Sequence, residues 1–137
     1  MTLLRPAKLT DIDFLSCHPA RPVPATVSAQ IRDGRLRIIE VDGEPIGFIK
    51  FCSLWEDLPF LEVIYILPPR RKFGFGREAL RLWEAEMAEL KFDFVLTSTR
   101  SDEHAQHFWR HIGYSDCGVL TWGDNPSEIF MQRDIRD

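Results

Sequence analysis

The spacing of hydrophobic residues changes along the chain, and these changes predict the order of strands and helices. Two β-rich runs, 36–41 and 46–51, flank Asp42-Gly43, which is a strong signal for a tight hairpin between antiparallel strands. Residues 60–67 are apolar on both faces except for the carboxylate of Glu62. That pattern is typical of a central strand covered on both sides.

A helix and a further strand follow this apolar strand. The segment from about Gly76 to Leu90 has apolar side chains at helical spacing, at Leu80, Trp83, Met87 and Leu90. Residues 92–98 then have the composition of a strand. A strand, a helix and a strand in this order predict a parallel pair joined by a right-handed crossover.

The N-terminal part of the chain is less regular. Residues 10–15 and 24–32 predict short helices. Three prolines in residues 18–24 predict a loop between the two helices, because proline fixes φ and lacks an amide donor.

The C-terminal part predicts one more helix and two strands. We expect the helix to follow a cap at Ser101 and to end at Gly113, with strands at 119–122 and 128–133. The whole pattern predicts an α/β (α+β) fold with a twisted mixed sheet of six or seven strands. This sheet would be mostly antiparallel with a central parallel pair, and helices would cover both faces.

The composition of the chain limits the classes of protein to which it can belong. The 137 residues predict a single domain, 1–137, and 45% hydrophobic with 28% charged residues is ordinary for a soluble protein. A net charge of −4 disfavours nucleic acid as a partner, and no run reaches the roughly 20 apolar residues that span a membrane. Three widely spaced cysteines fit neither a disulfide framework nor a zinc site, so we expect reduced thiols and a cytoplasmic location.

The most informative local sequence is the cationic, glycine-containing loop Arg71-Lys72-Phe73-Gly74-Phe75-Gly76 between the apolar strand and the helix. Glycines let a ligand approach the backbone, and the amides of a helix N-terminus favour an anion such as a pyrophosphate. The chain has no P-loop and no complete dinucleotide fingerprint, so ATP and NAD are not the expected ligands. On spacing alone, a tight strand-to-helix turn without a ligand explains the loop equally well.

Arg71, Gly74 and Gly76 resemble the acetyl-CoA motif of the GNAT N-acetyltransferase superfamily: an Arg or Gln, two residues, Gly, one residue, then Gly or Ala. The similarity extends to residues 105–114, which look like the family's closing helix. It is clear from about Arg35 to Tyr114 and holds only in outline before that.

The resemblance implies acetyl-CoA as the acyl donor and a direct transfer of its acetyl group to a primary amine of a small molecule or peptide. It implies that main-chain groups near Ile66 bind the pantetheine arm and that Asp102, at the position of a frequent Asn, accepts a hydrogen bond from it. For Asp102, a role in complementing the helix dipole is an equal alternative. The residues implied to bind the pyrophosphate are Arg71, Lys72, Phe73, Gly74, Phe75, Gly76 and Arg77.

Glu62 is the candidate general base, because direct transfer needs a neutral amine and this carboxylate interrupts an apolar strand. We expect the strand to desolvate Glu62 and so to raise its pKa. The alternative is a residue near the strand end that pairs with an arginine or reaches water.

One position departs from the family. Where many members have a tyrosine that protonates the leaving thiolate, this chain has Trp109, and indole is no such acid. The thiolate leaves unassisted, or one of four other side chains replaces the tyrosine: Tyr65, Tyr114, His104 or His107.

Several alternatives stay open at this stage. The family resemblance also fits a catalytically silent acyl-CoA sensor or partner module, or an enzyme that acetylates protein N-termini or lysines. Trp55, Glu56 and Asp57 suit a cationic amine, although a surface loop explains them as well. The histidines at 104, 107 and 111 are spaced for a metal but more often form a solvated helix face, so we expect no metal. A homodimer through the terminal strands is a further possibility.

Overall fold

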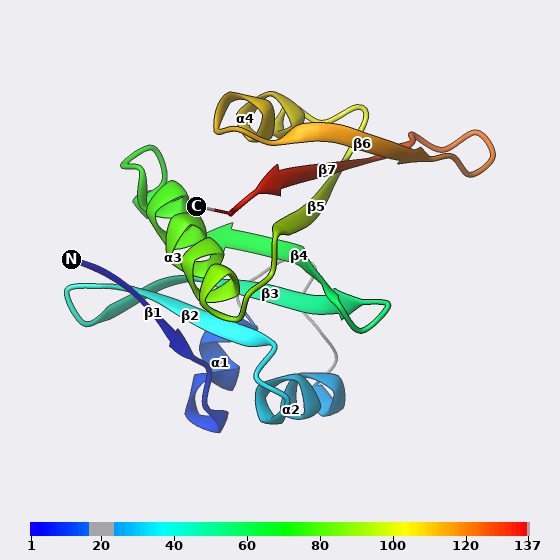
Figure 1. Cartoon of the computed structure of the whole chain (residues 1–137). Helices are drawn as coiled ribbons and strands as arrows, with labels where there is room; N and C mark the ends of the chain where they lie inside the picture. The colour runs from blue at the N-terminus through cyan, green and yellow to red at the C-terminus, as the bar shows by residue number, and fades with distance from the viewer. Residues whose placement is uncertain (17–23, 137) are drawn as a thin grey trace. The chain divides into compact units, whose positions relative to one another are not determined.

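The computed structural model describes residues 1–16 and 24–136, so Cys17 and most of the expected proline loop lie outside the described residues. Seven strands form one sheet in the order β1-β2-β3-β4-β5-β7-β6 (Figure 1). The strands are β1 (Thr2–Pro6), β2 (Leu36–Val41), β3 (Glu44–Leu54), β4 (Leu58–Ile66), β5 (Phe94–Arg100), β6 (Ser115–Leu120) and β7 (Glu128–Asp134). The helices are α1 (Ile12–Leu15), α2 (Pro24–Arg32), α3 (Phe75–Glu89) and α4 (Ala105–His111), with 3-10 turns at Leu9–Asp11 and Pro68–Arg70.

The sheet is mixed, as the hydrophobic pattern predicted. β4 occupies the central position and pairs in parallel with β5, whereas β1–β2, β2–β3, β5–β7 and β6–β7 are antiparallel pairs. The turn between β2 and β3 has φ of 52° at Asp42 and 83° at Gly43. Two successive left-handed residues are what a two-residue type I′ hairpin requires.

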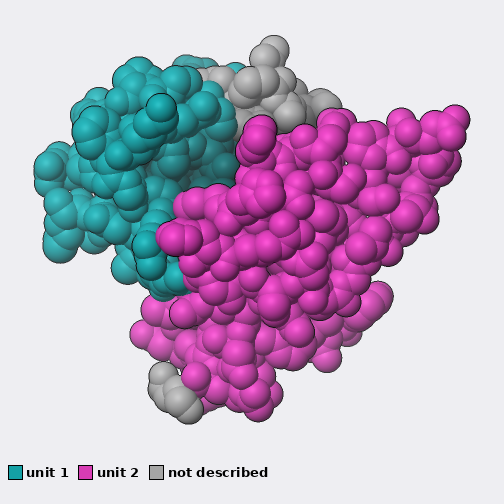
Figure 2. All heavy atoms as spheres, turned by 90° about the horizontal axis from the view of Figure 1, so that it is seen from above, with its two compact units in different colours: residues 1–51, 63–83 teal, residues 52–62, 84–137 magenta. Residues whose placement is uncertain are grey.

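The chain separates into two compact units (Figure 2). Unit 1 comprises residues 1–51 and 63–83, and unit 2 comprises residues 52–62 and 84–137.

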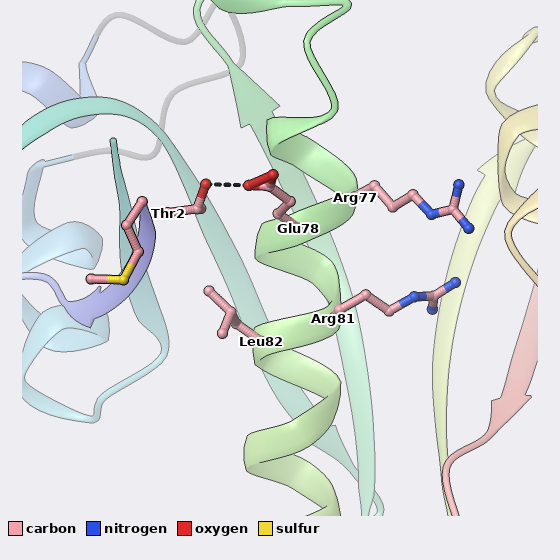
Figure 3. A pocket seen from close by; sticks show the side chains of 6 residues that line it. Thr2, Arg77, Glu78, Arg81 and Leu82 are labelled. Carbon is pink, nitrogen blue, oxygen red and sulfur yellow. Dashed lines mark hydrogen bonds between the residues drawn. The ribbon is translucent and has the colours of Figure 1, made fainter. Parts of the chain in front are cut away.

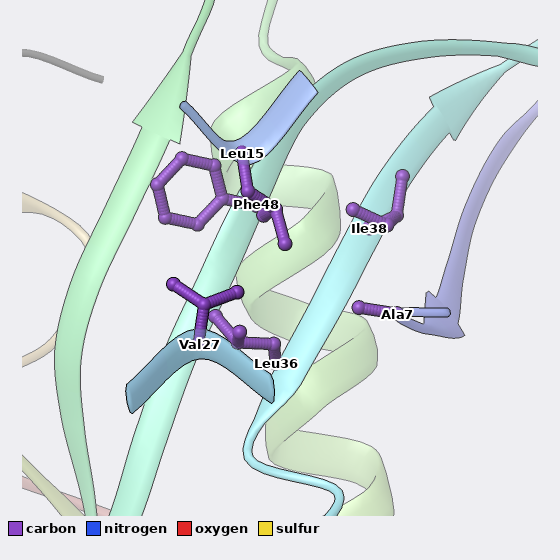
Figure 4. Close-up of a cluster of buried hydrophobic side chains, with 6 residues drawn as sticks. All are labelled: Ala7, Leu15, Val27, Leu36, Ile38 and Phe48. Atoms are coloured by element: carbon purple, nitrogen blue, oxygen red, sulfur yellow. The ribbon is translucent and has the colours of Figure 1, made fainter. Parts of the chain in front are cut away.

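In unit 1, helices cover both faces of the strands. One face buries a cluster in which Leu15 of α1 and Val27 of α2 pack with Leu36, Ile38 and Phe48 (Figure 4). Phe51 lies three positions after Phe48 on β3 and therefore points to the other face. There its ring packs against Trp83 of α3 at 5.7 Å between centroids. The fully buried Trp83 thus fixes α3 against the sheet.

In unit 2, the two faces of β5 and β7 differ in burial. Val95, Thr97 and Met131 are buried on one face. On the opposite face, Ser98 and its partner Phe130 are only half-buried. This second face therefore stays accessible in unit 2.

A buried carboxylate ties three elements of unit 2 together. Glu84 of α3 is 3% exposed. Its two oxygens accept hydrogen bonds from the Tyr114 hydroxyl at 2.6 Å and from Arg133 of β7 at 2.8 Å. A buried charge is tolerated only when it is paired in this way, so the three residues form one unit of stability.

The boundaries of α3 and β6 differ from the sequence prediction in ways that affect the core. α3 ends at Glu89, and Leu90 is 65% exposed, so Leu90 does not belong to the buried stripe of Leu80, Trp83 and Met87. Lys91 adopts φ of 74°, a left-handed conformation that ends the helix. β6 starts at Ser115 instead of residue 119, and all six of its residues are exposed. An edge strand without a buried face lacks the alternation that marks a strand in sequence.

We expect Glu84→Gln to lower the free energy of unfolding by about 2 kcal/mol, because charge-assisted hydrogen bonds to Tyr114 and Arg133 weaken. The control is Glu89→Gln, an exposed residue of the same helix, which should stay within about 0.5 kcal/mol of wild type. Urea denaturation followed by circular dichroism measures both variants. Equal stability of the two variants would contradict the role of Glu84.

Candidate functional site

The loop between β4 and α3 has two left-handed residues. β4 ends at Ile66, the 3-10 turn Pro68–Arg70 follows, and then Lys72 and Gly74 have φ of 71° and 84°. α3 begins at Phe75, and the carbonyl of Gly74 accepts the amide of Glu78 at 3.0 Å. The first amides of an α-helix have no hydrogen-bond acceptor within the helix. In this protein the loop leads directly into these amides of α3.

Arg71 holds the start of the loop against the end of β4. Its Nε donates to the carbonyl of Ile66 at 2.8 Å, and its guanidinium lies 5.3 Å from the centre of the Tyr65 ring. A cation above an aromatic face adds a modest attraction. The side chain therefore stabilises the conformation of the loop.

The backbone at Gly74 and Gly76 has room for a ligand. A Cβ at Gly74 would meet nothing within 4 Å, and one at Gly76 would meet only Ile66 and Ile64, at 3.6 and 4.0 Å. Packing within the chain would therefore tolerate a Cβ at position 76, so it does not by itself demand a glycine there. Position 74 favours glycine because its φ is positive. An anion can approach both residues from the open side, so the loop fits a diphosphate.

Cationic side chains surround the same helix end. Lys72 and Arg77 are exposed, and Phe73, 66% exposed, packs on Phe75 at 5.8 Å between ring centroids. Arg81 lies one turn after Arg77, and Figure 3 shows both arginines on the same side of α3, away from the side where Glu78 meets Thr2. Sequence reasoning missed Arg81, although its four-residue spacing from Arg77 was the available signal.

The parallel pairing of β4 and β5 is short. Among the described residues, the two strands pair at Phe60–Leu96 and Leu61–Thr97, whereas β5 and β7 pair from Phe94–Asp134 to Arg100–Glu128. The buried hydroxyl of Thr97 donates to the carbonyl of Leu61 at 3.1 Å, at the last paired position of β4. The pairing of β4 with β5 thus ends one residue before Glu62.

Glu62 is exposed, so the expected desolvation of its carboxylate is wrong in this structure. The reason is that the neighbouring apolar residues of β4 are themselves incompletely covered. Phe60 and Ile64, which share the face of Glu62, are only half-buried, whereas Leu61 on the opposite face is buried.

The candidate general acids occupy different environments. Trp109 is buried, and its ring centroid lies 4.9 Å from that of Tyr114. The Tyr114 hydroxyl donates a hydrogen bond to the carboxylate of Glu84. Tyr114 is therefore committed to the core. His104 and His107 are exposed, with ring centroids 6.2 Å apart.

The predicted start of the last helix is also displaced. α4 begins at Ala105 with His104 at its cap, so Ser101 is no helix cap. Asp102 lies before the helix and accepts a hydrogen bond from Arg100 at 2.9 Å.

Metal and thiol chemistry find little support among the described residues. No group of three His, Cys, Asp or Glu side chains there is arranged to hold a metal ion. Cys117 is an exposed residue, but partial desolvation of its thiol, with a smaller contribution from Asp116, raises the pKa of that thiol, which disfavours the nucleophilic thiolate. No helix in residues 1–16 or 24–136 has the length and apolar character needed to cross a membrane.

An apolar pocket of about 670 Å³ lies within unit 2. The lining residues come from the end of β3, the β3–β4 turn, β4, β5, β6 and β7, and none of them is charged. Trp55 at its edge is 83% exposed and has φ of 51°, which is rare for a bulky residue. Glu56 follows with φ of 72°. The amide of Asp57 donates to the carbonyl of Leu54 at 3.2 Å, so these two residues form the tight turn between β3 and β4, which accounts for their left-handed backbone.

Solved structures with this fold include acetyltransferases. Ard1 from Thermoplasma volcanium superposes with a TM-score of 0.81 at 17% identity, covering 97% of both chains. The ribosomal-protein-S18-alanine N-acetyltransferase from Escherichia coli gives 0.79 at 16% identity, covering 100% of this chain and 96% of the other. A GNAT family acetyltransferase from Elizabethkingia anophelis with acetyl-CoA bound gives 0.75 at 12% identity, covering 97% of both chains. At these identities the likeness establishes the fold.

Comparison with curated protein sequences found no match. The family model described as the acetyltransferase (GNAT) family matches residues 6–114. That match covers most of the chain. The protein therefore belongs to the GNAT family of acetyltransferases, which use acetyl-CoA as the acyl donor.

Proposed function

We propose that this enzyme transfers the acetyl group of acetyl-CoA directly to a primary amine of a small molecule or peptide. The observation that carries the proposal is the open loop from Lys72 to Gly76, where left-handed backbone leads into the N-terminus of a long helix. This arrangement suits a diphosphate such as the one in coenzyme A.

In this proposal, the amides of residues 73–77 bind the diphosphate, and Lys72 and Arg77 add positive charge. Ile64 and Ile66 at the end of β4 are half-buried and lie beside Gly76, so they offer apolar surface to the pantetheine arm. When bound, the coenzyme supplies an acyl group activated as a thioester. Arg71 acts indirectly because it fixes the loop against Ile66.

Glu62 is the proposed base for the acceptor amine. Amines are protonated near neutral pH, and a carboxylate at the position where β4 and β5 stop pairing is able to take the proton directly or through water. Since Glu62 is exposed in the protein, the bound reactants would have to exclude water from its carboxylate. Backbone donors at the same point of β4 would polarise the carbonyl that the amine attacks.

The leaving thiolate needs little help. A thiol has a pKa of about 8.5, so its anion is an acceptable leaving group near neutral pH without a general acid. An enzyme of this kind can therefore work with Trp109 at the position where many family members have a tyrosine. Tyr65 and the exposed His104 and His107 remain the alternative proton donors.

A peptide or protein amine is the second form of acceptor. The Escherichia coli enzyme with this fold is named for the alanine of a ribosomal protein, which favours this form. The remaining alternative is a silent acyl-CoA-binding module. Release of coenzyme A with any amine rules that module out, whereas tight binding without turnover over a broad panel of amines supports it.

We expect Arg77→Glu to weaken coenzyme A binding about tenfold, equivalent to about 1.4 kcal/mol, because the new carboxylate repels the diphosphate. The same change favours the helix dipole, so stability should not fall. Arg32→Glu, an exposed arginine of α2, is the control. Titration calorimetry at low and high salt should show a difference between the variants that shrinks with salt. Equal dissociation constants for the two variants would refute the site.

We expect Glu62→Gln to lower turnover about 100-fold near neutral pH while coenzyme A affinity stays within about twofold of wild type. Activity should partly return as the pH rises, because the amine then loses its proton without a base. Glu89→Gln, an exposed carboxylate at the end of α3, should change turnover little. Rates measured by thiol release over a range of pH test this role. Unchanged turnover at every pH would remove Glu62 from the mechanism.

A further inference from the structure

We propose that the apolar pocket of unit 2 receives a bulky apolar first side chain of a peptide whose α-amine is acetylated. The inference rests on the proposed function and adds the acceptor class to it. Its basis is the chemistry of the pocket wall, its position on β4, the free edge of β6 and the charge of unit 2.

The pocket wall selects an apolar group. Three strands contribute to the wall: Phe60 lies on β4, Leu96 on β5 and Phe130 on β7. The ring centroids of the two phenylalanines are 6.0 Å apart. A charged side chain placed there would lose its hydration without a counter-charge, because no lining residue is charged. A Leu, Met or Phe side chain instead gains the transfer free energy of its buried apolar surface.

The pocket is close to the proposed point of reaction. Phe60 pairs with Leu96 and lies two residues before Glu62 on the same strand, which corresponds to roughly 7 Å along β4. A side chain held against Phe60 therefore leaves its own α-amine near Glu62. An apolar group remote from the amine would not be placed in this way.

The free edge of β6 favours a peptide over a small amine. β6 is the terminal strand of the sheet, and four consecutive residues, 117–120, line the pocket. Consecutive strand residues point to opposite faces, so a pocket that reaches all four extends to the edge of the strand. The pairing with β7 also shifts register between Asp116 and Gly118, a feature common next to binding sites. An extended peptide is able to add its backbone to such an edge while one side chain occupies a pocket.

The charge of unit 2 favours a cationic acceptor. Unit 2 contains 14 Asp and Glu against 5 Lys and Arg, whereas unit 1 contains 7 and 12. A peptide N-terminus arrives as an ammonium group and is attracted to this unit. The surface therefore recruits the amine by charge, and the uncharged pocket then selects the side chain next to it.

Gly118→Leu tests the pocket directly. A Cβ at Gly118 meets nothing within 4 Å, so a side chain fits without disturbing the strand but occupies the space of the pocket. Ser115→Leu is the control, because Ser115 is an exposed residue of the same strand outside this pocket. The probes are three acceptors: a peptide with Leu first, the same peptide with Gly first, and isoamylamine, which carries a similar apolar group without a backbone.

For the wild type, we expect kcat/KM for the Leu peptide to exceed those for the Gly peptide and isoamylamine at least tenfold. Gly118→Leu should remove this preference while coenzyme A affinity and the activity on the Gly peptide are retained, and Ser115→Leu should keep the preference. A wild type that does not distinguish the Leu and Gly peptides overturns the inference. So does a Gly118→Leu variant that retains the preference, and equal activity on isoamylamine assigns the pocket to small amines.

A binding measurement separates this inference from the proposed function. The methyl NMR signals of Val119 and Leu120 should shift with the Leu peptide and not with the Gly peptide, whether or not turnover occurs. Shifts without turnover of any amine would contradict the proposed function and support the pocket. Turnover without such shifts would support the proposed function and overturn the pocket.

Discussion

The proposed chemistry depends on the conformation of the chain between β4 and α3. Lys72 and Gly74 are left-handed, and Arg71 bonds the last carbonyl of β4, so the loop is fixed at its start. The buried stripe of α3, with Trp83 packed against Phe51, fixes the helix that follows. Since the proposed anion-binding groups are backbone amides, the sequence must preserve a backbone shape here. This is why the proposed site is marked in the sequence by two glycines and one arginine.

The two units carry formal charges of opposite sign. Unit 1 holds the cationic loop and an excess of basic residues, and unit 2 holds an excess of acidic residues and an uncharged pocket. An anionic coenzyme and a cationic amine are therefore attracted to different parts of one chain. Long-range attraction of this kind raises association rates at low ionic strength and contributes little to the fold. The formal net charge of −4 conceals this division.

The sequence predicted the features that depend on local patterns. The β2–β3 hairpin, the amphipathic α3 and the parallel β4–β5 pair were confirmed, because turn residues and periodicity encode them directly. The features that depend on distant partners were missed. Glu84 meets Tyr114 and Arg133 only after folding, and β6 is a strand only because β7 pairs with it. The exposure of Glu62 is likewise decided by the incomplete burial of its neighbours on β4.

The central claim is that backbone amides after β4 bind the diphosphate of coenzyme A. Amide NMR of isotope-labelled protein tests it most directly, with coenzyme A and pantetheine, which lacks phosphates, as ligands. The account predicts that the amide signals of residues 73–77 shift strongly with coenzyme A and hardly at all with pantetheine. Equal shifts with both ligands, or shifts confined to other residues, would contradict it.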